Sequence, residues 1–315
     1  MYAKYFVLFA ILFTGWFLRK IKFIDDKMND SINKLIVYFA YPCLIVHNIG
    51  SIDMAGNILV SFLIAFGLSL AVFYLYGLIS YGYAKIRKFP KETSNLFELA
   101  MTTPNDGFMG FPVALIFFGD MGLLMMLAHN AAMNFYLFTY GISLLRRNYE
   151  GTRQATPGRF LKALLKLLFN PNILALFIGF IISFIGGTIP EPVDDYLVYI
   201  GDISTPMAMI FIGSTLAGYK VSDILKDRCV IEAGFVKLIL LPVVTAAVVY
   251  FLPVAPIIKF IVVLGTCFPT AATVSMLSQQ EGHDPAPTSK ALFFSTVLSM
   301  ATVSAALKII TMLFM

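Results

Sequence analysis

The sequence predicts an all-α integral membrane protein with ten transmembrane helices, arranged as two inverted repeats of five helices each. Three observations predict this fold class: the composition, the distribution of basic residues between the connecting segments, and matched breaks in the apolar segments. The chain is 59% hydrophobic and only 13% charged, whereas about a quarter of the residues of a soluble domain are charged. We therefore divide its 315 residues into transmembrane spans rather than into globular domains.

Ten apolar segments lie between charged residues and turn signals, and each is long enough to cross a bilayer. They are residues 3–20, 31–50, 57–84, 96–118, 122–145, 161–187, 195–217, 229–252, 256–278 and 289–314. The third segment has no charged residue between Met54 and Ala84. It is long for one crossing and too short for two, so it predicts a single tilted helix.

Basic residues occur in alternate connections between these segments. The first, third, fifth and seventh connections contain Arg19, Lys20, Lys22, Lys27, Lys85, Arg87, Lys88, Lys91, Arg146, Arg147, Arg153, Arg159, Lys220, Lys226 and Arg228. The connections at 51–56, 119–122, 187–195 and 253–256 contain no Lys or Arg. Because short loops rich in Lys and Arg stay in the cytoplasm, we expect a multi-pass protein of the cell membrane with both termini extracellular.

The central connection divides the spans five and five. Residues 146–160, RRNYEGTRQATPGRF, form the longest polar connection, so we assign residues 1–150 to a first five-helix repeat and 151–315 to a second. Each half contains an odd number of spans, and two homologous halves would therefore lie upside down relative to each other. Prolines occur at matched positions, Pro42 and Pro206 in the second spans and Pro112 and Pro269 in the fourth.

The fourth apolar segment is interrupted at its middle. Residues 102–107 read TTPNDG, and Gly110 and Pro112 follow. Pro and Gly cost about 3 and 1 kcal/mol relative to Ala inside a helix. In lipid the freed backbone groups have no water, so such a break is tolerated only where it is buried in protein or lines a cavity. The pattern predicts two half-helices whose ends form a substrate site near the membrane midplane.

The sequence resembles the auxin efflux carrier (AEC) family over its whole length. The resemblance depends on the ten spans, the basic central connection and four local patterns. These patterns are the run 105–112 (NDGFMGFP), Thr205-Pro206, the run 237–242 (KLILLP) and Pro269. The most specific of them is an asparagine five residues before Gly-x-Pro, which Asn105, Gly110 and Pro112 match.

The resemblance implies a fold similar to that of bile acid/sodium symporters and sodium/proton antiporters. Spans 4 and 9 would cross at their unwound centres, and this transport unit would move against a scaffold of spans 1, 2, 6 and 7. The family also implies organic anions, often carboxylates, as substrates. Its plant auxin exporters often carry a long central loop, and the short connection here indicates a bacterial member.

We therefore expect a secondary transporter of small organic anions, such as carboxylates of the malate or malonate type, that works by alternating access. The alternative is a sodium-coupled symporter of the bile acid/sodium symporter type. An intramembrane enzyme would need paired carboxylates, a Ser/His set or a metal motif at one depth, so no enzymatic activity, catalytic residue, cofactor or metal site is expected. The expected partners are the organic anion and the lipid bilayer, with a homodimer as an option and no nucleic acid.

The candidate substrate-binding residues come from the second and fourth spans of each half. They are Pro42, Cys43, Asn105, Asp106, Gly107, Gly110, Pro112, Thr205, Pro206, Pro269, Thr270 and Ala271. The Asn105 amide can hydrogen-bond a substrate carboxylate or cap the broken backbone, and the first role is favoured because a polar group at the midplane is costly without one. Gly107, Gly110, Pro112 and Pro269 are expected to shape the break rather than to bind the ligand.

Five ionisable residues inside the spans have competing interpretations. An ionised Asp106 would repel an organic anion, so it is neutral, or titrates as a proton-coupling site, or caps the second half-helix, which the Asp-Gly sequence favours. His47 and His129 are more typical of neutral groups bonded to a neighbouring helix than of proton relays. Lys237 and Glu98 are expected to extend towards the cytoplasmic interface.

The charge asymmetry predicts which connections a membrane-impermeant thiol reagent can reach. After replacement of Cys43, Cys229 and Cys267, a cysteine placed near Asp53 or Asp194 should be labelled in intact cells, and one near Arg153 only after permeabilisation, because basic loops stay inside. Labelling at the Arg153 position in intact cells would exclude the topology of ten spans with both termini outside.

Overall fold

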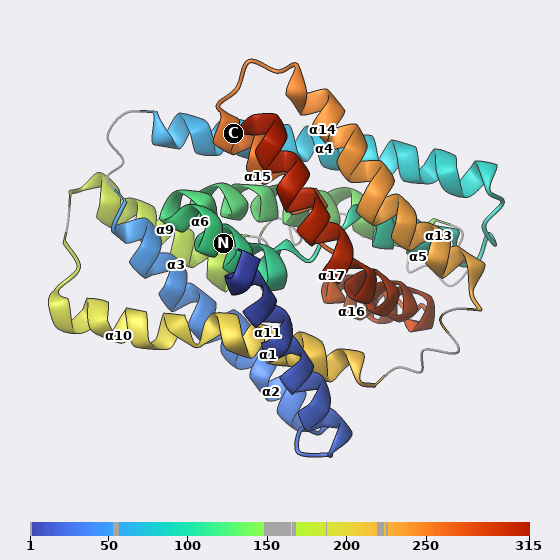
Figure 1. Cartoon of the computed structure of the whole chain (residues 1–315), viewed down its shortest axis with the longest axis horizontal. Helices are drawn as coiled ribbons and strands as arrows, with labels where there is room; N and C mark the ends of the chain where they lie inside the picture. The colour runs from blue at the N-terminus through green and yellow to red at the C-terminus, as the bar shows by residue number, and fades with distance from the viewer. Residues whose placement is uncertain are drawn as a thin grey trace. The chain divides into compact units, whose positions relative to one another are not determined.

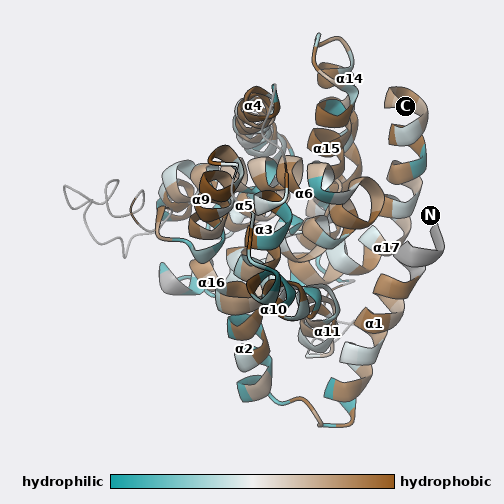
Figure 2. Ribbon diagram, turned by 90° about the vertical axis from the view of Figure 1, so that its left-hand side faces the viewer, coloured by the Kyte–Doolittle hydropathy of each residue, from teal (hydrophilic) through white to brown (hydrophobic). Residues whose placement is uncertain are grey.

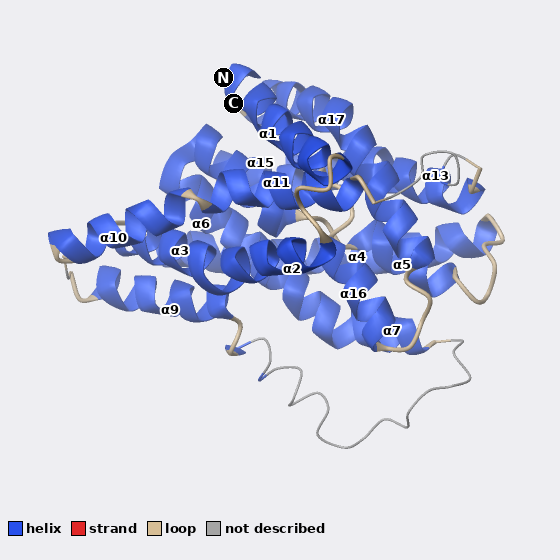
Figure 3. Ribbon diagram, turned by 90° about the horizontal axis from the view of Figure 1, so that it is seen from below, coloured by secondary structure: helices blue, strands red, loops and turns tan. Residues whose placement is uncertain are grey.

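The computed structural model describes residues 2–52, 57–147, 165, 168–186, 188–218, 224 and 226–315. Every regular element in this part of the chain is a helix, and Figure 3 shows it as helices and loops. The α-helices are α1 (Tyr2–Lys20), α2 (Asp26–Leu35), α3 (Tyr41–Gly50), α4 (Ile58–Ile86), α5 (Ser94–Thr102), α6 (Phe111–Tyr136), α7 (Ile142–Arg146), α9 (Pro171–Phe184), α10 (Glu191–Asp202), α11 (Ser204–Leu216), α13 (Arg228–Phe235), α14 (Leu241–Tyr250), α15 (Pro256–Thr266), α16 (Ala272–Gln280) and α17 (Ala286–Phe314). The π-helical turns are η1 (Ile36–Ala40), η2 (Asp106–Gly110), η3 (Leu137–Gly141) and η4 (Val236–Leu240).

Six helical stretches of the described residues are long and apolar enough to cross a membrane. They are Asp26–Gly50, Ile58–Ile86, Asp106–Arg146, Glu191–Leu216, Arg228–Tyr250 and Ala286–Phe314. Two shorter apolar helices are Pro171–Phe184 and Pro256–Thr266. Hydrophobic residues, brown in Figure 2, predominate along α4 and α14. The all-α membrane class is thereby confirmed, while the count of ten spans and the inverted repeat stay predictions.

The boundaries between predicted spans agree with the structure at two positions. The third predicted span is one uninterrupted helix, α4, of 29 residues. Within α6 the backbone leaves helical geometry at Gly119 (φ 60°, ψ −150°), where the sequence predicts the connection between spans 4 and 5. Residues 148–164 of the central connection, with the boundary between the two repeats, lie outside the described residues.

Three π-helical turns are each followed, after one residue, by a proline. Pro42, Pro112 and Pro242 each occupy the second position of the α-helix that follows η1, η2 or η4. Proline has no N–H and its ring collides with the carbonyl four residues earlier. In a π-turn the N–H bonds to the carbonyl five residues earlier instead of four. The turn therefore contains one extra residue, and the chain continues as a helix through the proline. Asp106 and Lys237 both lie in such turns.

The chain forms two compact units. Unit 1 comprises Met1–Val60, Phe111–Leu124 and Leu165–Tyr219, and unit 2 comprises Ser61–Gly110, Met125–Leu164 and Lys220–Met315. Unit 1 therefore contains the predicted spans 1, 2, 6 and 7, which the family resemblance assigns to a scaffold, together with the first half of α6. Unit 2 contains both breaks of the predicted fourth and ninth spans.

Close approach between α1 and α11 organises unit 1. The two helices pack along each other (Figure 1) and meet at Gly15 and Gly213. A Cβ added at Gly213 would overlap the backbone carbonyl of Leu12, and one added at Gly15 would overlap that of Ile210. Small residues of this kind let transmembrane helices approach closely enough for van der Waals contact between their backbones.

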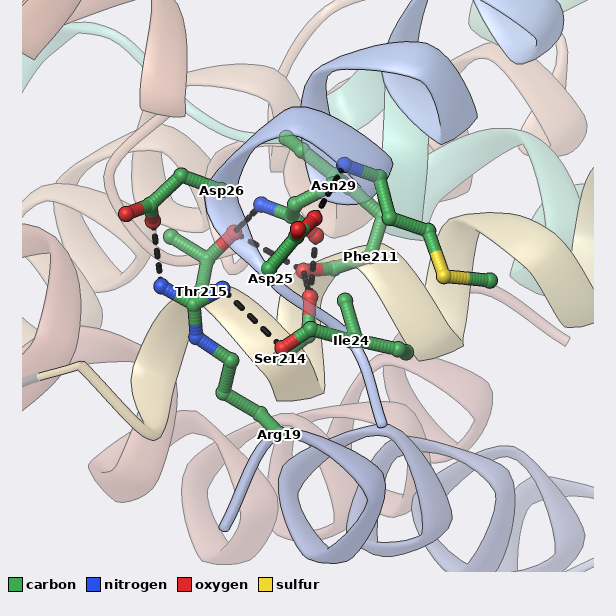
Figure 4. A network of polar contacts seen from close by, with 9 residues as sticks. Arg19, Ile24, Asp25, Asp26, Asn29, Phe211, Ser214 and Thr215 are labelled. Carbon is green, nitrogen blue, oxygen red and sulfur yellow. Dashed lines mark hydrogen bonds and ion pairs between the residues drawn. The ribbon is translucent and has the colours of Figure 1, made fainter. Parts of the chain in front are cut away.

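Polar contacts fix one end of the same helices (Figure 4). The Asn29 side chain of α2 donates to Thr215 Oγ1 (3.1 Å) and accepts from the Ser214 hydroxyl, both on α11. Arg19, near the end of α1, pairs with Asp26 at the start of α2. These contacts join α1, α2 and α11, so unit 1 is held together by packing along the helices and by hydrogen bonds at their ends.

The glycine contact predicts a selective loss of stability. Gly213→Ala should lower the midpoint of thermal unfolding of the purified protein in detergent, because overpacking typically costs about 1–3 kcal/mol and the clash is with backbone. Gly67→Ala is the matched control, since Gly67 lies in α4 with no atom within 4 Å of an added Cβ. An unchanged midpoint for Gly213→Ala would contradict the close packing of α1 on α11.

Candidate functional site

Two interrupted helical segments of unit 2 meet at their breaks. Pro104 and Thr270 form an antiparallel bridge. The Asn105 N–H donates to the Pro269 carbonyl (2.6 Å), and the Ala271 N–H donates to the Thr103 carbonyl (3.0 Å). Backbone groups that each break frees are thus satisfied by the other segment, as burial without water requires.

Side chains at this crossing add further hydrogen bonds. Thr270 donates from its hydroxyl to the Ala100 carbonyl (2.9 Å), and its N–H donates to the Ser295 hydroxyl of α17 (3.0 Å). Thr270 and Ala271 are both buried. Thr270 therefore ties the crossing to α5 and α17, which supports a role in packing.

Asn105 is a residue of the crossing whose side chain is available. It is 3% exposed, and its backbone N–H and carbonyl bond to Pro269 and Met109. Its side-chain amide makes no hydrogen bond to any residue that the structure describes. Because a buried amide has several donor and acceptor positions to satisfy, this arrangement favours a ligand-binding role for Asn105 over capping.

The open helix ends give the crossing an electrostatic character. The π-helical turn η2 begins at Asp106 and α16 begins at Ala272, directly after the two paired segments. The N-cap position of α16, Ala271, supplies no side-chain hydrogen bond. Helix N-termini carry about half a positive charge and attract anions. The crossing thus places two such ends next to a buried amide.

Asp106 is held by two side chains of α6. It is completely buried. Its Oδ2 lies 2.7 Å from His129 Nδ1, and its Oδ1 accepts from Asn130 Nδ2 at 2.7 Å. Neither oxygen accepts a backbone N–H in the described chain, so the interpretation of Asp106 as a helix cap is wrong. It belongs instead to a buried polar cluster of Asp106, His129, Asn130 and Lys237.

The position of His129 is fixed by packing. Its ring is fully buried and lies against Gly265, where an added Cβ would come within 2.5 Å of Cε1. The Phe73 ring packs on it at a centroid distance of 4.9 Å. While Nδ1 faces Asp106, Nε2 is buried without a hydrogen-bond partner. His129 is thus bonded to a neighbouring segment, as the sequence predicts, but it also keeps one nitrogen available.

Lys237 is the main site residue that sequence reasoning misplaced. It lies in η4, is fully buried, and its ammonium has no hydrogen-bond partner in the described chain. The expectation that it extends to the cytoplasmic interface is therefore wrong. The Asp106 carboxyl group lies close enough to interact with it electrostatically. A buried ammonium is costly unless it is compensated, so its proximity to the Asp106 carboxylate is a constraint on the whole cluster.

The other ionisable candidates are paired. Glu98 is buried in α5 and forms an ion pair with Arg147 rather than reaching the interface alone. In unit 1, His47 Nδ1 lies 2.6 Å from Asp194 Oδ1, which joins α3 to α10. His47 and His129 thus each have a carboxyl group of another segment as partner.

The candidate residues divide between the two units. Unit 2 contains Asn105, Asp106, Gly107, Gly110, Pro269, Thr270 and Ala271. A Cβ at Gly110 would lie 3.1 Å from Asp106 Cβ, Met126 Sδ and Phe268 Cε2, so a larger residue here would require these side chains to shift. Unit 1 contains Pro42, Cys43, Pro112, Thr205 and Pro206. Among the described residues, no group of three or more His, Cys, Asp or Glu could hold a metal ion.

Comparisons with known proteins agree on one class. The family model described as membrane transport protein matches residues 1–307. A protein of Methanothermobacter thermautotrophicus named "Uncharacterized transporter" is 22% identical over 295 residues, which cover 93% of each chain. A protein of Rhizobium meliloti named "Putative malonate transporter" is 25% identical over 307 residues, which cover 96% of this chain and 93% of that protein.

Proposed function

The chain belongs to the membrane transport protein family, the auxin efflux carrier family whose motifs it carries, and on this premise we propose that it is a secondary transporter of small organic anions. The substrate binds at the crossing of the two broken segments and is carried across the cell membrane by alternating access. Membership of a transporter family also supports the absence of enzymatic activity.

The crossing is the observation that carries this proposal. Two apolar segments far apart in the sequence are both interrupted, and their interruptions pair through Asn105 and Pro269 and through Thr103 and Ala271. Secondary transporters use such discontinuous helices to place helix ends and unwound backbone at a substrate site near the midplane. A structural role alone would not require two breaks, since an unbroken helix satisfies its own backbone.

Three features of unit 2 suit a carboxylate substrate. The N-terminus of α16 has no side-chain cap, the Asn105 amide has no described hydrogen-bond partner, and the Lys237 ammonium is buried without one. Each can donate to an anion or stabilise its charge. The name of the Rhizobium meliloti relative supports a small dicarboxylate such as malonate.

Charge balance supports proton coupling through Asp106 and His129. An ionised Asp106 and a protonated Lys237 would cancel each other's charge. An incoming carboxylate adds a negative charge in a medium of low dielectric constant, where an uncompensated charge is costly. Uptake of a proton by the Asp106–His129 pair, whose atoms lie 2.7 Å apart, restores the balance.

The sodium-coupled alternative has less support at this site. Hard cations need oxygen ligands with available lone pairs. Both Asp106 oxygens face nitrogen atoms, of His129 and Asn130, and Asn130 Oδ1 accepts from Asn134 Nδ2 at 3.0 Å.

Removing either side of the crossing should prevent transport. Asn105→Ala and Pro269→Ala should each abolish or strongly reduce uptake of labelled malonate into proteoliposomes while expression and membrane insertion stay nearly unchanged. The first removes the buried amide, and the second relaxes the break that positions the helix ends.

Asn57→Ala and Pro192→Ala are matched controls, because both residues are exposed and belong to unit 1, whereas the crossing belongs to unit 2. They should transport at the wild-type rate. If both crossing variants also did so, the crossing would be excluded as the substrate site.

Asp106→Asn tests the coupling step, because asparagine has nearly the same shape but cannot titrate. We expect its transport rate to lose the pH dependence of the wild type, while malonate still raises the midpoint of thermal unfolding. The control is Asp194→Asn, which alters the other histidine–aspartate pair, His47 and Asp194, and should keep the pH dependence. An unchanged pH profile and rate for Asp106→Asn would remove Asp106 from coupling.

A further inference from the structure

We propose that a pocket beside the end of α4 binds the phosphate of an anionic phospholipid headgroup. This pocket, which we name the basic pocket, lies within unit 2 and has a volume of about 490 Å³. The lining residues used below are Tyr81, Lys85, Lys88, Lys91, Glu98 and Arg147. The transport mechanism proposed above uses none of them, so the site is separate from the crossing.

The turn that ends α4 fixes Lys88 at the basic pocket. The Lys88 N–H donates to the Lys85 carbonyl (3.3 Å) and the Phe89 N–H donates to the Ala84 carbonyl (2.9 Å), which is the Schellman pattern. Lys88 has φ 54°, a left-handed conformation that favours glycine. Phe89 is buried and packs on the Phe97 ring at 5.6 Å. The backbone at Lys88 is therefore anchored, and a glycine there would preserve the turn.

Positive charge exceeds negative charge among the pocket residues. Arg147 pairs with Glu98, the one acidic lining residue, and its guanidinium lies 4.9 Å from the centre of the Tyr81 ring. Lys85 Nζ lies 6.0 Å from the same ring. Neither Lys85 nor Lys88 has an acidic partner among the described residues. Glu98 thus offsets Arg147 alone, and the charges of Lys85 and Lys88 are available to an anion.

These charged side chains line one pocket, whereas lysines at the ends of membrane helices are usually dispersed. Arg147 follows α7, 49 residues after Glu98, and its ion pair with Glu98 brings it to the same pocket. The cavity volume lies within the range of about 300–1,000 Å³ typical of small-molecule sites. It offers more room than a single inorganic phosphate uses, as a glycerophosphate headgroup requires.

The surroundings favour a lipid over a soluble anion. Leu78 and Ile86 of α4 are exposed, so acyl chains would cover the helix next to the basic pocket. The charge asymmetry of the loops predicts that this end of α4 is cytoplasmic, where anionic lipids attract basic segments. Basic pockets between transmembrane helices at that depth suit phosphate headgroups.

Native mass spectrometry of the purified full-length protein in neutral detergent tests the proposal. Phosphatidylglycerol should be retained at lower concentration than phosphatidylcholine. Lys88→Gly should weaken retention of phosphatidylglycerol about fivefold, since each lysine near a membrane surface contributes about 1 kcal/mol to such binding. Lys85→Gln together with Lys88→Gly should weaken it further.

Lys22→Gly is a matched control. Lys22 follows α1 in the same type of turn with φ 62°, lies in unit 1, and its replacement removes one charge as Lys88→Gly does. The proposal would be overturned if Lys22→Gly weakened the retention of phosphatidylglycerol as much as Lys88→Gly did. It would also be overturned if Lys88→Gly retained this lipid as well as the wild type. Displacement of phosphatidylglycerol by inorganic phosphate, glycerol phosphate or malonate at equal concentration would assign the basic pocket to a soluble anion and likewise overturn it.

Discussion

The structure of unit 2 depends on one constraint: a backbone that is broken inside a membrane must find hydrogen-bond partners within the protein. Pro104 and Pro269 interrupt two apolar segments, and each interruption supplies partners for the other. An isolated break would leave N–H and C=O groups without water, at a cost of several kcal/mol each. The pairing of the two breaks therefore determines where the helix ends lie, and the helix ends determine where an anion can bind.

The buried charges follow from the same geometry. Asp106 begins the segment after one break, and Lys237 lies in a π-turn of the helix that contains Pro242. A π-turn inserts one residue and so rotates the following helix by about 100°. In this way a proline-containing segment can continue as a helix while its polar residue faces the protein interior. Lys237 is thereby buried in unit 2 together with the Asp106 carboxyl group.

The sequence alone predicted the features that depend on local chemistry. Pro104 and Pro269 marked the breaks, and the absence of charge in the third segment indicated the single helix α4. The sequence did not predict the burial of Lys237 or the partners of Asp106. The depth of a residue in the protein and the direction in which its side chain points depend on tertiary contacts. A helical wheel also assumes 3.6 residues per turn, which η4 does not have. His129 gave a signal, an imidazole in an apolar span, but its pairing with Asp106 required the fold.

Charge balance limits what the buried cluster can do in transport. A fixed ammonium would hold an organic anion too tightly to release it, and an ionised Asp106 would repel it. In the proposed mechanism these two effects offset each other, so the helix ends and Asn105 would determine the affinity for the substrate. The remaining imbalance appears only when the substrate carboxylate arrives. In the proposed coupling step the Asp106–His129 pair offsets it: Asp106 faces one ring nitrogen of His129, and the other ring nitrogen has no partner in the described chain. A dicarboxylate adds one more negative charge than a monocarboxylate, so the same balance requires a larger proton uptake with malonate than with a monocarboxylate.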